Sequence, residues 1–242
     1  MRPVNRGDSP QDQDFDDYRN AFPELASRLG FYCSYCERRI ATNLAVEHIQ
    51  PKKLPQYAHL KGRWENFLLG CVNCNSTKLN KDVVLSRFLL PDRDNTQFAY
   101  LYPQDGKVTV NSTKLSDDQA SLAENTLTLV GLDKAIDEIA DENGQMVAID
   151  RVGQRMETWL IALDSRIDLE SAPTNEMRRQ VVRTALGHGY FSIWMTAFAG
   201  DHEMQRQFID SFPGTARDCF DNQTFLAVSP RPANGLADGS KV

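Results

Sequence analysis

The sequence lacks a long hydrophobic run. Its longest apolar stretches, such as residues 159–163, are far shorter than the roughly 18 residues that a membrane-spanning helix needs, so we expect no membrane association. No apolar segment follows the positive charges of residues 1–7, as it would in a secretory signal. Cysteine is also scarce, with five in 242 residues, and four of these form Cys-x-x-Cys pairs. This pattern favours a metal site over a disulfide framework and predicts a cytoplasmic protein, with the remaining Cys219 as a buried, inert thiol.

The chain has no excess of positive charge, because its formal net charge is −6 at pH 7. This balance argues against a protein that coats nucleic acid without specificity. The charge is unevenly divided, however. Residues 31–91, the basic segment, contain nine Lys and Arg against four Asp and Glu, a balance of +5 that leaves −11 for the rest. A basic segment inside an acidic chain predicts a local phosphate-binding site.

The basic segment contains two Cys-x-x-Cys pairs, Cys33 with Cys36 and Cys71 with Cys74. Four thiolates at this spacing suit a tetrahedral Zn²⁺. Because four protein ligands leave no position for water or substrate, such a zinc would be structural and would hold the two ends of the segment together. A redox dithiol and a chance pairing remain as alternatives.

The polar residues between the two pairs are suited to chemistry. Residues 45–49 are predicted to form a short strand that carries Glu47 and His48 and ends before Pro51. An imidazole can take a proton from water near neutral pH, and a neighbouring carboxylate can hold Mg²⁺. Neighbours in a strand point to opposite faces, so these two side chains would reach one site only through a twist or a bulge. Taken alone, His48 would more often be a structural histidine.

The ordered motif Cys-x-x-Cys, Glu-His-Ile-x-Pro, Asn, Cys-x-x-Cys-Asn-x-x-Lys resembles the HNH family of ββα-metal nucleases. The resemblance implies that His48 is the general base and that Asn66 braces the loop and the histidine. It also implies a catalytic Mg²⁺ or Mn²⁺ held by Asn75 and by Glu47, where the family more often has Asp. Lys78 matches a basic position that contacts phosphate.

The reaction implied by this resemblance is metal-assisted hydrolysis of a phosphodiester bond in nucleic acid, most simply DNA. Further basic side chains flank the motif and are expected to contact phosphates: Lys52, Lys53, Lys61 and Arg63. Two alternatives stay open, a zinc-stabilised nucleic-acid-binding module without catalysis and a scaffold subunit. The choice between DNA and RNA, the sequence preference and the stoichiometry with partners stay open as well.

A narrower similarity concerns antiphage systems. The wording Tyr-Cys-x-x-Cys-Glu-Arg-Arg-Ile and residues 123–133 are similar to the HNH proteins that accompany Septu ATPases and some retrons. This similarity implies a role in antiphage defence with an ATPase partner, for which the acidic remainder of the chain would provide an interface.

The predicted fold class is α+β, a zinc-stapled ββα-metal HNH core followed by a mainly α-helical C-terminal region. We divide the chain into a loose arm with a helix (1–30), the nuclease domain (31–91), a mainly helical region that is the candidate for partner binding (92–228) and a flexible tail (229–242). A hairpin is predicted around the turn sequence Gln-Asp-Gly at 104–106. Helices are predicted over residues 16–29 with a break near Pro23, and over 74–79, 119–129, 133–142, 147–169, 174–186, 190–199 and 201–212.

Overall fold

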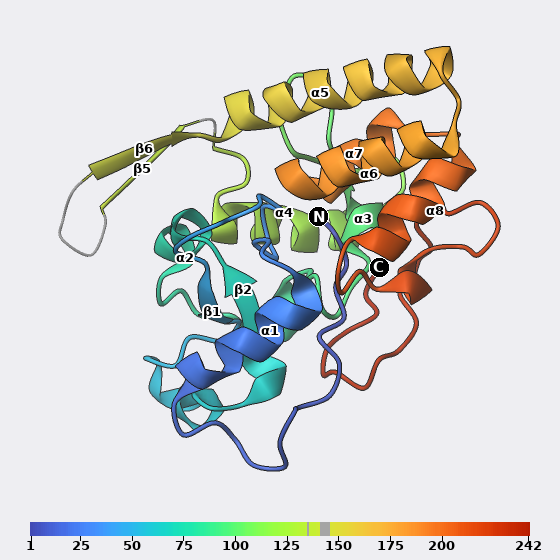
Figure 1. Cartoon of the computed structure of the whole chain (residues 1–242). Coiled ribbons are helices and arrows are strands. Elements are labelled where there is room, and N and C mark those ends of the chain that lie inside the picture. Colours follow the sequence, from blue (N-terminus) through green and yellow to red (C-terminus); the bar gives the residue numbers. More distant parts are fainter. Residues whose placement is uncertain (135, 141–145) are drawn as a thin grey trace.

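A computed structural model describes residues 1–134, 136–140 and 146–242 of the protein. Figure 1 shows a small two-stranded sheet, β1 with β2, beside helices α1 and α2, and a group of helices from α5 to α8 on the other side. Helix α4 runs between the two groups (Figure 1) and contacts α2. The buried hydrophobic side chains form one cluster that includes residues of both groups. The mixed fold with a mainly helical C-terminal half is therefore as the sequence predicts.

The small sheet pairs β1 (Ala45–His48) with β2 (Phe67–Gly70) in antiparallel, one-to-one register. All four residues of β2 are buried, as expected for its run of Phe and Leu. Helix α2 (Val72–Lys78) begins directly after β2. Cys71 caps this helix, because its sulfur accepts a hydrogen bond from the Cys74 N–H at 3.5 Å. The predicted order of strand, strand and helix is confirmed, and the helix begins two residues earlier than expected.

The N-terminal helix differs from its prediction in detail. A 3-10 turn, η1 (Tyr18–Ala21), leads into α1 (Phe22–Leu29). Pro23 does not break the helix, because it lies in the first turn, where its missing N–H has no intrahelical partner to lose. The helix ends at Gly30, whose φ of +74° is readily reached only by glycine.

The segment between the two groups of helices contains short elements. Helix α3 (Thr96–Ala99) is followed by the predicted hairpin, which is reduced to β3 (Tyr100–Leu101) and β4 (Thr109–Val110). Helix α4 (Asp117–Val130) begins at a capping box, in which Ser116 and Gln119 bond each other's backbone N–H. Four further 3-10 turns join the larger elements: η2 (Pro55–Leu60), η3 (Trp64–Asn66), η4 (Leu85–Arg87) and η5 (Arg217–Cys219).

The helix predicted over 133–142 is wrong. Strand β5 (Ile136–Ala140) pairs instead with β6 (Met146–Asp150), and residues 141–142 of that prediction lie outside the described residues. The sequence carries the signal that was missed, since Asn-Gly at 143–144 separates two segments rich in β-branched residues. The next predicted helix accordingly begins later, as α5 (Arg151–Ser171).

The remaining helices follow the predictions within a few residues. They are α6 (Asn175–His188), α7 (Phe191–Ala197) and α8 (His202–Ser211). Helix α5 contacts both α6 and α7. Cys219 is fully buried, and burial raises the pKa of its thiol to about 12, consistent with an inert thiol. In the described part of the chain, no helix is both long and apolar enough to cross a bilayer.

Both terminal segments pack against the body of the protein, whereas the sequence predicts a loose arm and a flexible tail. Val4 is 1% exposed, and Arg231 is equally buried. The Arg231 guanidinium donates to the carbonyl oxygens of Pro91 at 3.1 Å and Val4 at 3.2 Å, which fastens the tail to the arm. These bonds join residues outside helices and strands, so the hydrophobic periodicity of the sequence does not predict them.

Candidate active site

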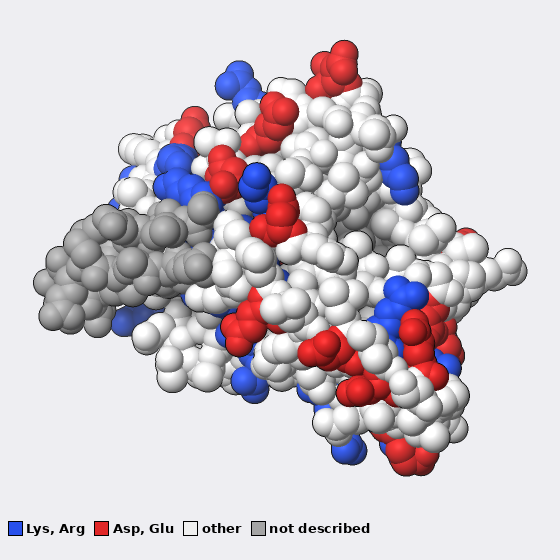
Figure 2. All heavy atoms as spheres, turned by 90° about the horizontal axis from the view of Figure 1, so that it is seen from above, with Lys and Arg blue, Asp and Glu red and all other residues white. Residues whose placement is uncertain are grey.

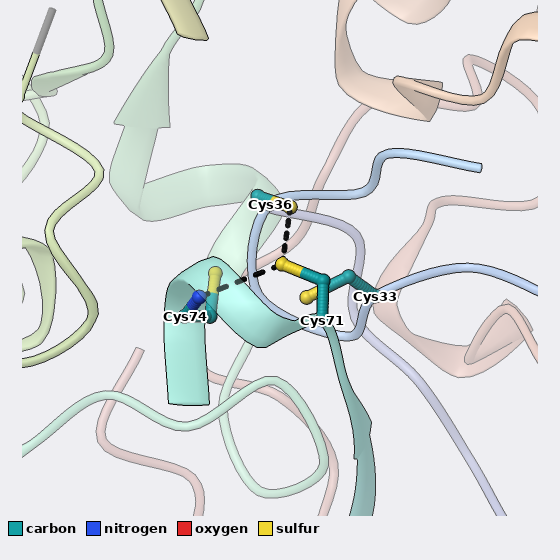
Figure 3. A group of neighbouring side chains, drawn as sticks. All are labelled: Cys33, Cys36, Cys71 and Cys74. Atoms are coloured by element: carbon teal, nitrogen blue, oxygen red, sulfur yellow. Dashed lines mark hydrogen bonds between the residues drawn. The ribbon is translucent and has the colours of Figure 1, made fainter. Parts of the chain in front are cut away.

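The four cysteines of the two Cys-x-x-Cys pairs lie together (Figure 3). The first pair sits on a turn, residues 32–39, that is closed by a bridge between Tyr32 and Arg39. Ser34 docks this turn on β2, because its N–H donates to the Leu69 carbonyl at 2.8 Å and its hydroxyl accepts from the Leu69 N–H at 3.2 Å. The second pair lies where β2 passes into α2.

The geometry of the cluster fits a zinc ion. All four sulfur atoms lie within 4.8 Å of one another, and those of Cys36 and Cys71 are 3.7 Å apart. Zn–S bonds of about 2.3 Å in a tetrahedron place the sulfurs roughly 3.8 Å apart. Burial raises the pKa of Cys33, so thiolates at this site need a cation beside them. The cluster could therefore hold zinc with four protein ligands.

A cavity of about 600 Å³ is lined by residues of β1 and α2. We call it the active-site cavity, because the candidate site residues Glu47, His48 and Asn75 all line it. Its wall is completed by the N-terminal turn η1 and the start of α1, and by the loop after β1. The lining residues are Tyr18, Arg19, Phe22, Leu44, Ala45, Val46, Glu47, His48, Pro51, Lys52, Lys53, Asn75, Lys78, Leu79 and Asn80.

His48, the last residue of β1, is held on three sides. Its Nε2 lies 2.9 Å from the carbonyl oxygen of Lys61. A carbonyl only accepts, so Nε2 carries the proton and Nδ1 keeps its lone pair. The rings of Tyr18 and Phe67 meet the imidazole edge-on, with centroids at 4.7 and 5.2 Å. Burial lowers the pKa of His48 to about 4, so the ring is neutral at pH 7 and can accept a proton at Nδ1.

Glu47 lines the same cavity as His48, although the ladder between β1 and β2 pairs one residue to one and contains no bulge. Of the two possibilities that the sequence left open, a twist or a bulge, this ladder contains no bulge, and both side chains nevertheless line the cavity. Burial raises the pKa of Glu47, and the ammonium of Lys78, 2.8 Å from Oε1, opposes this shift.

Lys78 lies deeper than a phosphate contact would. Its side chain is 2% exposed, and its Nζ donates to the His48 carbonyl at 2.7 Å besides pairing with Glu47. The ammonium therefore joins α2 to β1 from inside the cavity wall. This arrangement differs from the phosphate contact that the sequence predicts, because the helix turn that carries Lys78 faces the sheet.

Asn75 lies in the middle of α2 and comes close to Glu47 across Gly70. A Cβ added to Gly70 would lie 3.0 Å from the Cβ of Glu47 and 3.2 Å from both Asn75 amide atoms. The glycine thus leaves the space in which these two side chains approach each other. A carboxylate and an amide oxygen on one cavity are a donor set that a hard cation such as Mg²⁺ or Mn²⁺ accepts, with waters and a phosphate as further ligands.

Asn66 braces the loop that follows β1. Its Oδ1 accepts from the Gln50 N–H at 2.8 Å, and its Nδ2 donates to the Gln50 carbonyl at 3.0 Å and to the Leu60 carbonyl at 3.3 Å. These bonds fix both ends of the loop. The loop ends close to the Lys61 carbonyl that accepts the hydrogen bond from His48 Nε2. Asn66 is 4% exposed, so its part in the site is structural support.

The basic residues flanking the motif divide into two groups. Lys52 and Lys53 line the active-site cavity, while Lys61 and Arg63 are exposed outside it. Lys61 contributes its carbonyl to His48, and Arg63 pairs with Asp14 at 2.9 Å. Figure 2 shows the face of the molecule seen from above Figure 1. On the described part of this face, basic and acidic residues are interspersed.

The sequence analysis missed the contribution of the N-terminal turn to this cavity. Tyr18, Arg19 and Phe22 form part of its wall. Tyr18 and Phe22 are four residues apart and so share one face of a helical segment. This spacing predicts an aromatic face, but it does not predict which part of the protein that face contacts.

Comparison with known proteins agrees with this geometry. Residues 33–81 match the family model described as HNH endonuclease, so this part of the chain carries an HNH domain, which supports a nuclease. The match contains all four cysteines, Glu47, His48, Asn66, Asn75 and Lys78. No curated protein matches the chain.

We expect one zinc ion per chain, bound by the four cysteines. Cys74→Ser should lose the zinc and much of the stability of the β1–β2–α2 unit, because a structural zinc contributes directly to folding. Metal analysis by mass spectrometry and thermal unfolding measure both effects. Cys219→Ala, which removes the buried thiol outside the cluster, is the matched control and should retain zinc. Full zinc content in Cys74→Ser would contradict the four-cysteine site.

His48 should stay neutral well below the pH at which an ordinary histidine is protonated. In buffer without added Mg²⁺, a pH titration of its ring signals by NMR should give a midpoint near pH 4, with Nε2 protonated throughout. His48→Asn assigns the signal. The unfolded chain takes up this proton near pH 6.5, so it binds more protons than the folded chain between pH 6.5 and 4. The free energy of unfolding should accordingly fall as the pH drops through that range. A midpoint above pH 6 would show that the imidazole is not buried as described.

Lys78→Met should destabilise the protein by about 3–5 kcal/mol, because it leaves the buried Glu47 carboxylate without its ammonium partner. Urea unfolding measures this loss. The double variant Glu47→Gln with Lys78→Met should be more stable than Lys78→Met, since the uncompensated charge is gone. Lys53→Met removes an exposed lysine of the same cavity and should change stability by less than about 0.5 kcal/mol. Equal effects of the two lysine variants would rule out the buried ion pair.

Proposed function

We propose that this protein is a metal-dependent HNH endonuclease that hydrolyses phosphodiester bonds of nucleic acid, most simply DNA, in the cytoplasm. The observation that carries the proposal is that an imidazole, a carboxylate and an amide line one cavity. His48, Glu47 and Asn75 all line that cavity, and all three lie in the segment that matches the HNH endonuclease model.

His48 is the proposed general base. With Nε2 donating to the Lys61 carbonyl, Nδ1 is the atom that would take a proton from the attacking water. The imidazole is neutral at cellular pH, so Nδ1 has a lone pair with which to accept that proton. Asn66 supports the reaction indirectly by holding the loop that ends at Lys61.

Glu47 and Asn75 would hold the catalytic Mg²⁺ or Mn²⁺. When bound, this ion would stabilise the negative charge that develops on the phosphate and on the departing oxygen. The Lys78 ammonium pairs with the Glu47 carboxylate at 2.8 Å, so the carboxylate is held in place before a metal binds. Lys52 and Lys53 line the cavity and are the basic residues best placed to contact substrate phosphates.

The non-catalytic alternatives are less well supported. A nucleic-acid-binding module or a scaffold subunit needs a zinc-stabilised fold and a basic surface. It needs neither a buried histidine with a free Nδ1 nor a carboxylate and an amide beside it. These groups are costly to bury, since each must find a partner inside the protein.

We further propose that the enzyme is an effector in antiphage defence and acts with an ATPase partner. The similarity of the first cysteine turn and of residues 123–133 to HNH proteins of Septu and retron systems supports this role. The balance of −11 outside the basic segment would suit a partner with a basic surface.

The first test is plasmid cleavage with purified protein, with and without added Mg²⁺ or Mn²⁺. We expect cutting only with added metal, and His48→Ala should lower the rate by about 10²–10⁴-fold, the usual contribution of a general base. Omitting the metal is preferable to a chelator, which would also remove zinc.

His59→Ala is the matched control for this test, because His59 is exposed and does not line the cavity. It should cut like the unchanged protein, and both variants should keep their zinc. Cleavage retained in His48→Ala would overturn the assignment of the base. Binding of DNA without metal-dependent cutting would favour the binding module.

A further inference from the structure

The segment before α1, residues 14–21, is fixed on the HNH domain although it lies outside the matching residues. The Phe15 N–H donates to the Gly62 carbonyl at 2.9 Å, and Asp14 pairs with Arg63 at 2.9 Å. The ring of Phe15 stacks on Trp64, with centroids 6.1 Å apart. The contact is close, because a Cβ on Gly62 would lie 2.2 Å from the Phe15 carbonyl oxygen. This segment therefore has a defined position beside the cavity.

Tyr18 is the residue of this segment that reaches the reactive groups. Its ring meets the His48 imidazole at 4.7 Å between centroids and an interplanar angle of 70°. The ammonium of Lys52 lies 3.3 Å from the centre of the same ring. One side chain thus contacts both the proposed base and a proposed phosphate ligand.

We propose that Tyr18 is a positioning residue of the active site, which holds the His48 imidazole and the Lys52 ammonium in place through its aromatic ring. The proposal rests on the proposed nuclease function for the roles of His48 and Lys52, but the contacts themselves do not depend on it.

The arrangement around His48 explains why a ring is needed there. Phe67 supports the imidazole from the core side, where it is fully buried, and the Lys61 carbonyl holds Nε2. Tyr18, which is half-buried and lines the cavity, closes the remaining side. Without it, the imidazole could turn toward the cavity and lose the bond that directs Nδ1.

The contact with Lys52 has a different purpose. A carboxylate beside this lysine would neutralise its charge, whereas the face of an aromatic ring attracts the ammonium and leaves its full charge. Lys52 can therefore be held at the cavity and still attract a phosphate. Tyr18 orders a flexible lysine before the substrate arrives, which lowers the entropy cost of binding.

The test compares Tyr18→Leu, which removes the ring, with Tyr18→Phe, which keeps it. Tyr57→Leu is the matched control, because Tyr57 is a half-buried tyrosine of the neighbouring loop that does not line the cavity. Three measurements are made on each: the NMR signals of the His48 ring in buffer without Mg²⁺, the salt dependence of binding to a short fluorescein-labelled DNA duplex, and kcat and KM for metal-dependent cleavage.

Tyr18→Leu should shift the His48 ring signals and lower kcat by about 10- to 100-fold, as expected for a displaced reacting group. The slope of log affinity against log salt should become smaller by about 0.9, the value of one lost phosphate contact. Lys52→Met should reduce the slope equally and should change the His48 signals less than Tyr18→Leu does, because it keeps the ring. Tyr18→Phe should behave like the unchanged protein in all three measurements.

Unchanged His48 signals and unchanged kcat in Tyr18→Leu would overturn the proposal. An equal loss in Tyr18→Phe would also overturn it, since the hydroxyl and not the ring would then be the active group. If the unchanged protein cuts no substrate, the proposed nuclease function fails. The NMR and binding measurements need no cleavage and still decide whether Tyr18 positions these two residues.

Discussion

The junction of the two Cys-x-x-Cys pairs is the point on which the geometry of the cavity depends. A two-stranded sheet of four residues per strand is marginal by itself. Cys71 follows the last residue of β2 and caps α2, so whatever fixes its sulfur also fixes the direction of that helix. Asn75 lies one turn further along, and its approach to Glu47 across Gly70 follows from that direction. A structural metal bound by the four cysteines would thus influence the distance between two side chains that it does not touch.

A second constraint is electrostatic. Glu47 is buried, and a lone carboxylate there would be protonated or would destabilise the fold. The Lys78 ammonium removes this penalty in the protein without a divalent ion, and it also holds the carboxylate in place. A catalytic cation at Glu47 would share or replace the same ion pair. If Glu47 holds the proposed cation, that cation competes with the Lys78 ammonium for one carboxylate, and its affinity would be lower than the carboxylate alone would give.

The sequence predicted which motif residues lie together, because residue type and spacing carry that information. The four cysteines, the order of strand, strand and helix, and the shared cavity of His48 and Asn75 needed no knowledge of the rest of the chain. The depth of Lys78 could not be predicted, because it depends on which face of α2 meets β1. The helix prediction over 133–142 was wrong because hairpin and helix patterns overlap there. The packing of the tail could not be predicted, because Arg231 bonds carbonyl oxygens that are more than a hundred residues away in the sequence.

The active-site cavity is also lined by residues that lie outside the segment matching the HNH model. The imidazole of His48 is enclosed by Phe67 from inside that segment and by Tyr18 from outside it. Burial by these rings keeps the imidazole neutral, since it disfavours the charged form, and the Lys61 carbonyl selects the tautomer. The HNH motif provides the proposed reactive groups, but the enclosure of His48 also involves a tyrosine about thirty residues earlier in the chain. A segment reduced to residues 33–81 would contain every motif residue and still expose the proposed base to water.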